Sequence, residues 1–231
     1  SLAKSENKKE NRPLLHSLTS LQQEANDIFG MTAADTLKSA QSLYEKKLIT
    51  YPRTDSNYLS DDMVSLIESI VKCLSGYDGE RILQLQSQGL NTDNRVIDNS
   101  KISDHHAIIP TNLISRLGCT ALDENEQRIV KLVINRFLSA LDKPYLYTET
   151  KYEFLVEDEV FKLTIKKSVE MGWKQYKVNA PAELDDEKEK TVYASYSEND
   201  TFTVDNLTVK QCETKPPKYF TESSLLAVME N

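Results

Sequence analysis

Residues 20–45 read SLQQEANDIFGMTAADTLKSAQSLYE, and the architecture of the chain is best approached from this stretch. Its apolar residues recur every three or four positions on both sides of Gly30, which predicts two amphipathic helices. Ser20 and Thr32 are the expected N-caps, and Gly30 is expected to end the first helix. Only Gly30 and Met31 separate the two helices, so the turn between them is very short.

Helical patterns continue on the C-terminal side of this pair. Two helices joined so tightly form either a helix-turn-helix-like unit or part of a small helical bundle, and the spacing fits both. Ser60 is expected to cap a third helix, and Asp123 with Glu126 is expected to form a capping box on a further one. The apolar stripes of these later helices are Met63, Leu66, Ile67, Ile70, Val71 and Leu74, and Ile129, Val130, Val133, Ile134, Phe137, Leu138 and Leu141.

The apolar period changes from helical to alternating after Pro144. Residues 151–156 and 161–166 each alternate apolar with polar side chains around the acidic turn 157–159, which predicts a β-hairpin. We therefore expect an α+β fold, with a multi-helix domain followed by an antiparallel β segment. Shorter alternating runs predict two or more further strands, in 192–196, 202–204 and 207–209.

The composition excludes several classes of protein. The 231 residues carry 28 Lys and Arg against 36 Asp and Glu, which gives a net charge of −8. Such an acidic chain is not a general basic binder of nucleic acid, because binding to the phosphate backbone depends on Lys and Arg. Three cysteines without a CxxC pair argue against a disulfide framework or a thiolate zinc site.

The location of the protein is an expectation of the same kind. No run approaches the roughly 18 apolar residues of a membrane span, so we expect a soluble, cytoplasmic protein that does not bind membranes. The chain starts at Ser1 without a signal peptide and stops at Asn231 soon after an apolar run begins. We expect it to be a piece excised from a longer protein.

Residues 48–56, LITYPRTDS, form the first segment that carries chemistry. The segment is short, contains β-branched residues and a proline, and is expected to be extended, with Tyr51 and Arg53 on one face. A tyrosine that attacks a phosphodiester needs a cation to neutralise the phosphate oxygens, and a guanidinium supplies that charge. The plainer interpretation is a packed tyrosine beside a solvated arginine.

The second such segment is 103–111, SDHHAIIPT, which contains two of the three histidines. Neighbouring residues of an extended segment face opposite ways, so only one of His105 and His106 is expected to point into a given site. Such a histidine can donate a hydrogen bond or a proton to a leaving oxygen. The alternatives are one buried and one exposed histidine, or a divalent-metal site.

Taken together, the motifs resemble the type IA DNA topoisomerases. The YPRTD and HHAII stretches resemble the topoisomerase III branch in particular, and the resemblance extends from about Pro13 to the C-terminus. Residues 215–226, KPPKYFTESSLL, resemble the entry to the fourth domain of the family. The remaining motifs are LTSLQQEAN at 18–26, AQSLYE at 40–45, ITYPRTDS at 49–56 and DHHAIIPT at 104–111.

The resemblance implies an enzyme, an isomerase that cleaves and rejoins one DNA strand so that another can pass. Tyr51 would be the nucleophile that becomes joined to the 5′ phosphate of single-stranded DNA. Arg53 would position the scissile phosphate, and His105 would form a hydrogen bond near it. The residues expected to contact DNA are Arg53, Thr54, Asp55, His106 and Arg136.

The resemblance also implies a division into domains. The Toprim domain, whose acidic residues hold Mg²⁺ in the family, is not in this chain. We therefore expect no metal on this chain, no activity from it alone, and single-stranded DNA and the missing Toprim and base domains as its partners. The expected domains are a polar arm with the end of a first β segment (1–18), the tyrosine domain (19–141), a second β segment (142–215) and the start of the base domain (216–231).

A split β domain predicts an unpaired strand edge, which is expected to be short, disordered or paired with another chain. Two other function classes stay open beside the enzyme fragment. One is a non-enzymatic DNA-binding module built on the helix-turn-helix-like pair. The other is a metal-dependent phosphoesterase of the DHH type, with Asp104, His105 and His106 as ligands, although no DxD motif precedes them.

Overall fold

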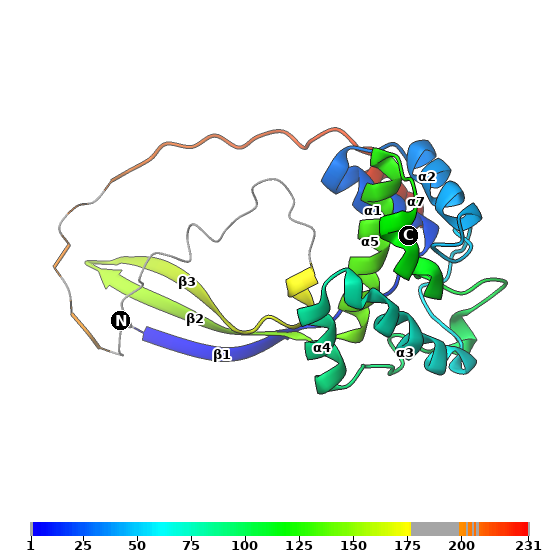
Figure 1. Ribbon diagram of the computed structural model, residues 1–231. Coiled ribbons are helices and arrows are strands. Elements are labelled where there is room, and N and C mark those ends of the chain that lie inside the picture. The colour runs from blue at the N-terminus through cyan, green and yellow to red at the C-terminus, as the bar shows by residue number, and fades with distance from the viewer. Residues whose placement is uncertain (1, 177–198, 202, 205, 207, 231) are drawn as a thin grey trace. The chain divides into compact units, whose positions relative to one another are not determined.

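Figure 1 shows the computed structural model, which describes residues 2–176, 199–201, 203–204, 206 and 208–230. The chain forms two compact units. One is a β-sheet unit that contains residues 2–10 and 145–170. The other is a helical unit, and its described residues are 11–144, 171–176 and 220–230.

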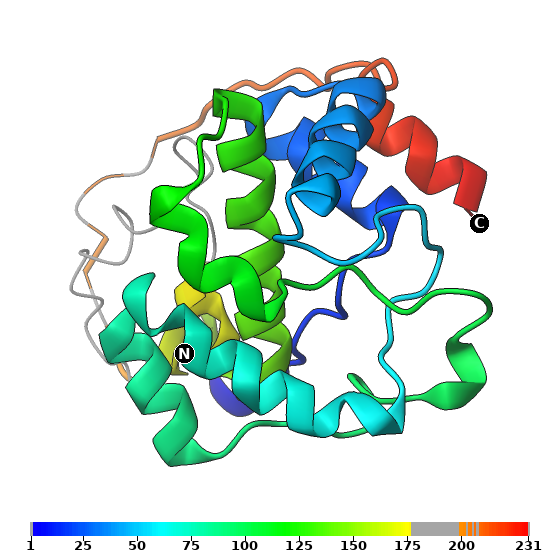
Figure 2. The same cartoon turned by 45° about the vertical axis from the view of Figure 1, so that its right-hand side comes forward.

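The helical unit is built around α5, which contacts α1, α2 and the turn η5 (Figure 2). Its core consists of buried aliphatic side chains from most of these elements. The helices are α1 (Leu18–Phe29), α2 (Ala33–Glu45), α3 (Val64–Cys73), α4 (Gly79–Gln88), α5 (Glu124–Leu141) and α7 (Glu222–Glu230). The 3₁₀ turns are η1 (Asp61–Met63), η2 (Leu74–Gly76), η3 (Asn99–Lys101), η4 (Asn112–Cys119) and η5 (Gly172–Tyr176).

The first helix begins earlier than predicted, because Ser17 and not Ser20 is its N-cap. Ser17 Oγ accepts a hydrogen bond from the Ser20 N–H at 3.2 Å, and Ser20 Oγ accepts one from the Ser17 N–H at 3.0 Å. The prediction of Ser20 as the cap is therefore wrong, since Ser20 is the third residue of the same capping box. Gly30 ends α1 in the left-handed conformation, with φ of 66°, and Thr32 caps α2, both as predicted.

The other helix starts agree in part with the sequence. The α5 capping box is confirmed, because Asp123 Oδ1 accepts from the Glu126 N–H at 2.8 Å and Glu126 Oε2 from the Asp123 N–H at 2.9 Å. Ser60 precedes η1 and makes no side-chain cap hydrogen bond. The sequence analysis missed α4, although Asp78 caps it and Gly89 follows it.

The β unit is a three-stranded antiparallel sheet in the order β1-β2-β3. The predicted hairpin is confirmed as β2 (Tyr145–Val156) and β3 (Glu159–Glu170), with its turn at Glu157. The polar stretch at the start of the chain is β1 (Leu2–Glu10), which pairs with β2 along its whole length. Its structure comes from backbone pairing with β2, which agrees with the expectation that residues 1–18 contain the end of a first β segment, and the bounds of that domain stay a prediction.

β1 and β3 lie at the two edges of the described sheet. β3 has 12 residues, so the expectation of a short edge strand is wrong for the described part of the chain, and pairing with another chain stays a prediction. Val204 and Val209 lie outside any strand, contrary to the prediction. The runs at 192–196, Phe202 and Leu207 lie outside the described residues.

The chain leaves and re-enters the helical unit at adjacent points. Gly172, with φ of 48°, turns the chain so that the Trp173 N–H donates to the Lys143 carbonyl oxygen at 3.0 Å. A Cβ on Gly172 would lie 2.5 Å from the carbonyl oxygens of Lys143 and Pro144, so the position requires glycine. At the start of the unit, the guanidinium of Arg12 donates to the Ala140 carbonyl oxygen at 2.9 Å.

The last helix, α7, packs against α1 (Figure 2). Glu222 Oε2 accepts a hydrogen bond from the Ala33 N–H at 2.6 Å, and Thr221 caps the helix by accepting from the Ser224 N–H at 3.1 Å. The assignment of residues 216–231 to a base domain stays a prediction. Within the described residues, a helix that combines the length and the apolarity needed to cross a membrane is not found.

Candidate active site

Tyr51 lies on the extended segment that follows α2, and this segment runs beside the histidine segment. The Thr50 N–H donates to the Ile109 carbonyl oxygen at 2.9 Å, and Thr50 Oγ1 accepts from the Ile109 N–H at 3.0 Å. Ile49 pairs with Pro110 in an isolated antiparallel bridge. Two segments about sixty residues apart in sequence are thereby fixed side by side.

Residues 16–18 join the same arrangement from the N-terminal side of α1. The His16 carbonyl oxygen accepts from the Ile108 N–H at 2.8 Å, and the Leu18 N–H donates to the Thr54 carbonyl oxygen at 2.9 Å. Thr54 is buried, and its Oγ1 donates to the His105 carbonyl oxygen at 2.9 Å. Thr54 therefore links the tyrosine segment to the histidine segment.

The Tyr51 ring packs between two other rings. Its centroid lies 4.6 Å from that of His105, with the planes tilted by 55°. The Tyr44 ring lies 5.4 Å away and meets Tyr51 edge to face, at 75°. In the described part of the chain, the Tyr51 hydroxyl has no hydrogen-bond partner, so ring packing and the backbone set its orientation.

A cavity of about 400 Å³ lies beside His105. It collects residues from the start of α1, the tyrosine segment and the histidine segment. Ser103 Oγ donates to Asp55 Oδ1 at 3.2 Å across these two segments. The lining residues are Leu18, Thr19, Arg53, Thr54, Asp55, Ser103, Asp104 and His105.

The electrostatics of the cavity favour an anion at one side. Leu18 and Thr19 are the first residues of α1, so the positive end of the helix dipole faces the cavity. Arg53 is exposed and adds a full positive charge with fork geometry. The lining also contains the carboxylates of Asp55 and Asp104, so the positive charge is confined to Arg53 and the start of α1.

Three predicted site residues, Tyr51, His106 and Arg136, do not line the cavity. His106 is half-buried, and its Nδ1 lies 2.8 Å from the Ala107 carbonyl oxygen. Arg136 projects from α5 and forms a hydrogen-bonded ion pair with Glu24 of α1, and it also donates to the Leu14 carbonyl oxygen at 3.4 Å. The structure thus brings Tyr51 and His105 together and groups Arg53, Thr54 and Asp55 with His105.

A buried polar cluster lies behind the start of α1. His16 is fully buried, with Nδ1 3.1 Å from Ser20 Oγ and Nε2 3.1 Å from Glu24 Oε2. Burial lowers the pKa of His16 to about 4, and the charge of Arg136 acts in the same direction. Burial raises the pKa of Glu24, but the contacts with His16 and Arg136 outweigh burial and lower this pKa to about 2.

The sequence analysis did not single out several residues of the site. Ser103 lines the cavity and was quoted only as part of the 103–111 segment, and Asp104, which also lines it, was named only as a ligand in the metal-site alternative. Thr19 and Tyr44 belong to the family-like stretches at 18–26 and 40–45. Helical spacing alone assigned Tyr44 to an apolar face, and only the structure shows its contact with Tyr51.

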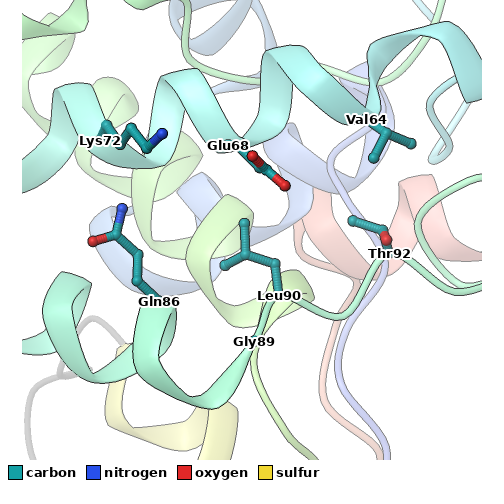
Figure 3. A pocket seen from close by; sticks show the side chains of 7 residues that line it. All are labelled: Val64, Glu68, Lys72, Gln86, Gly89, Leu90 and Thr92. Carbon is teal, nitrogen blue, oxygen red and sulfur yellow. The ribbon is translucent and has the colours of Figure 1, made fainter.

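A second cavity, of about 420 Å³, lies elsewhere in the helical unit (Figure 3). Figure 3 shows Glu68 and Lys72 projecting from α3 on one side, with Gln86 and Leu90 on the other. None of the predicted site residues lines it. The lining residues are Val64, Glu68, Lys72, Gln86, Gly89, Leu90 and Thr92.

The residues of the candidate site do not fit the Mg²⁺ that the resemblance implies. The carboxylates that line the cavity are Asp55 and Asp104, and Asp55 already accepts a hydrogen bond from Ser103. The described residues contain no group of three or more His, Cys, Asp or Glu side chains placed to hold a metal ion. We therefore assign no reaction step to a metal held by this chain.

On this α+β fold, Tyr51 packs on His105, and His105 lines a cavity together with Arg53. The family model for DNA topoisomerase matches residues 1–231, and the chain belongs to the DNA topoisomerase family. It is 37% identical to DNA topoisomerase 3 of Bacillus licheniformis over 226 residues, and this aligned region covers 97% of the chain. It is 38% identical over 230 residues, 99% of the chain, to DNA topoisomerase 3 of Staphylococcus epidermidis.

The chain spans 31% of the length of each of these relatives. Its fold is similar to that of full-length topoisomerase I from Thermotoga maritima, with a TM-score of 0.62 and 24% identity. That similarity covers 99% of this chain and 36% of the other. The resemblance to the topoisomerase III branch and the predicted α+β fold class are both confirmed.

Proposed function

We propose that this chain supplies the strand-cleaving nucleophile of a type IA DNA topoisomerase. Tyr51 Oη attacks a phosphorus atom of single-stranded DNA as its proton leaves, the P–O3′ bond breaks, and the 3′ oxygen takes up a proton. The tyrosine is then joined to the 5′ phosphate while another strand passes. Attack by the 3′ hydroxyl on the phosphotyrosine restores the phosphodiester and the free phenol.

The observation that carries this proposal is the packing of Tyr51 on His105, which lines a cavity together with Arg53. In this reaction Arg53 neutralises the non-bridging phosphate oxygens as negative charge develops on them. His105 donates a hydrogen bond or a proton to the 3′ oxygen. At the start of α1 the Leu18 and Ser20 N–H groups donate to Thr54 and Ser17, which leaves the Thr19 N–H to bind a neighbouring phosphate.

Further parts of the proposal concern partners. Thr54 and Asp55 line the cavity and are proposed to contact the DNA strand, as are His106 and Arg136, which lie outside the lining. We propose that Toprim and base domains of the whole protein complete the site and that Toprim acids hold the Mg²⁺. The chain alone is then inactive, and the whole protein acts in the cytoplasm.

A chimera tests the proposed role of Tyr51. This chain replaces the matching segment of the Bacillus licheniformis relative, and the chimera is incubated with Mg²⁺ and an end-labelled single-stranded oligonucleotide. Denaturation then traps the covalent adduct, which is measured on a gel. We expect an adduct with the chimera and none with Tyr51→Phe, because only the phenol oxygen can form the bond to phosphorus.

Tyr58→Phe is the matched control, since Tyr58 lies on the same segment and is also half-buried. It should leave the adduct unchanged. Binding of the oligonucleotide without any adduct would refute the proposal and favour a non-enzymatic DNA-binding module. Hydrolysis that persists in Tyr51→Phe and stops on chelation would favour the metal-dependent phosphoesterase.

A further inference from the structure

We propose that Tyr44 is a positioning residue that holds the Tyr51 ring in the orientation needed for attack. The inference rests on the proposed function and adds to it a residue outside the cavity. Tyr44 lies on α2 and does not line the cavity, and its ring packs edge to face against the ring of Tyr51. It therefore acts through Tyr51 and not on the DNA.

The end of α2 determines this contact. The Lys47 N–H donates to the Tyr44 carbonyl oxygen at 2.8 Å, and Lys47 has φ of 60°, which turns the chain back toward the helix. The Leu48 N–H then donates to the Leu43 carbonyl oxygen at 2.9 Å. This turn returns the extended segment past the last turn of α2, where Tyr51 meets Tyr44.

Tyr51 needs such a contact because little else restrains its side chain. It is only half-buried, and in the described residues its hydroxyl makes no hydrogen bond. His105 packs on it at 4.6 Å, but His105 is exposed and is proposed to serve the reaction itself. Tyr44, edge-on at 75°, has the favourable geometry of an aromatic pair.

The first test reads the position of the Tyr51 ring in this chain without DNA. The chain has three histidines, so selective ¹³C labelling of histidine gives a spectrum that three single variants assign. The Tyr51 ring current shifts the His105 signal, and Tyr51→Ala defines the unshifted position. We expect Tyr44→Leu to move the His105 signal toward that position while the His16 and His106 signals stay unchanged.

Two variants control this measurement. Tyr44→Phe keeps the ring and should leave the His105 signal in place. Tyr77→Leu removes a tyrosine of nearly equal exposure, 39% against 40% for Tyr44, and should also leave it in place. A His105 signal that does not move in Tyr44→Leu overturns the proposal, and so does a shift of all three histidine signals, which indicates a general loss of structure.

The second test measures the rate of adduct formation and the DNA affinity of the chimera. We expect Tyr44→Leu to slow the adduct about threefold to tenfold, in the range of one aromatic pair, with unchanged DNA affinity and normal rates in Tyr44→Phe. Weakened DNA binding at a normal rate overturns the positioning role. If the unmodified chimera forms no adduct, the proposed function fails, and the histidine spectrum still decides the role of Tyr44.

Discussion

His16 shows how a single buried side chain makes the helical unit sensitive to pH. The pKa of His16 is lowered to about 4 in the folded chain, against 6.5 for an exposed histidine. Between these values the unfolded chain binds a proton that the folded chain does not. The contribution of His16 to the free energy of unfolding is therefore largest above about pH 6.5. It falls by about 1.4 kcal/mol per pH unit as the pH drops toward about 4.

Urea unfolding of the wild type and of His16→Gln between about pH 7 and pH 5 checks this prediction. The variant should be less stable at neutral pH and should lose much of the pH dependence. Glu24 adds little to the change between about pH 7 and pH 5, because its stabilising contribution is lost only as the pH falls from its ordinary pKa of 4.5 toward its lowered pKa of about 2. His106→Gln is the control, and an equal loss of pH dependence in both variants would contradict the prediction.

The residue types of Tyr51, Arg53 and His105 are compatible with phosphate chemistry, but it was the family resemblance that favoured it over a packed tyrosine beside a solvated arginine. The chemical roles of these residues stay predictions, and the structure tests only where they lie. Their convergence depends on backbone pairing between segments distant in sequence, such as Thr50 with Ile109. The place of Arg136, bonded to Glu24, likewise depends on how α5 packs against α1, which no local pattern specifies.

At the scale of elements, a substitution at Gly30 measures the cost of backbone strain without a change in packing. It ends α1 with φ of 66°, and a Cβ at this position would meet no atom within 4 Å. Gly30→Ala should therefore destabilise the chain by about 1 kcal/mol through the left-handed backbone alone. Gly76→Ala, where a Cβ also meets nothing, is the control. Thermal unfolding followed by circular dichroism compares them, and equal melting temperatures would refute the assignment of strain to Gly30.

Elements with strong local signals could be predicted, and elements made by distant pairing could not. The α5 capping box and the β2–β3 hairpin are specified by neighbouring residues. β1 has the sequence LAKSENKKE, which is too polar to indicate a strand, and it exists because β2 offers it a complete row of backbone partners. The start of α1 was misplaced because Ser17 and Ser20 are both suitable caps, and only the reciprocal bonds identify the cap.

For the whole molecule, the structure predicts that the helical unit folds without the sheet. The two ends of the hairpin segment meet where the Trp173 N–H binds the Lys143 carbonyl oxygen, so a short linker can join them. A variant that lacks residues 1–10 and has a short Gly-Ser linker in place of 145–170 should keep a cooperative thermal transition and its helical circular dichroism. Gly172→Ala within this variant should lower the transition temperature, since a Cβ would clash with two carbonyl oxygens.

A non-cooperative melt of the shortened variant would show that the helical unit depends on the sheet. A transition temperature unchanged by Gly172→Ala would show that the backbone at position 172 does not closely approach the Lys143 carbonyl oxygen. The shortened variant and its Gly172→Ala form are compared by the same thermal melt, so each of the two predictions can fail separately.

The C-terminal end of α5 is where the backbone segments next to the three strands are fixed. Arg12 binds the Ala140 carbonyl oxygen, the chain passes from the end of α5 at Leu141 through Lys143 to β2, and the Trp173 N–H binds the Lys143 carbonyl oxygen. The backbone segments that lead to the three described strands are thus each fixed within the helical unit at the same end of one helix.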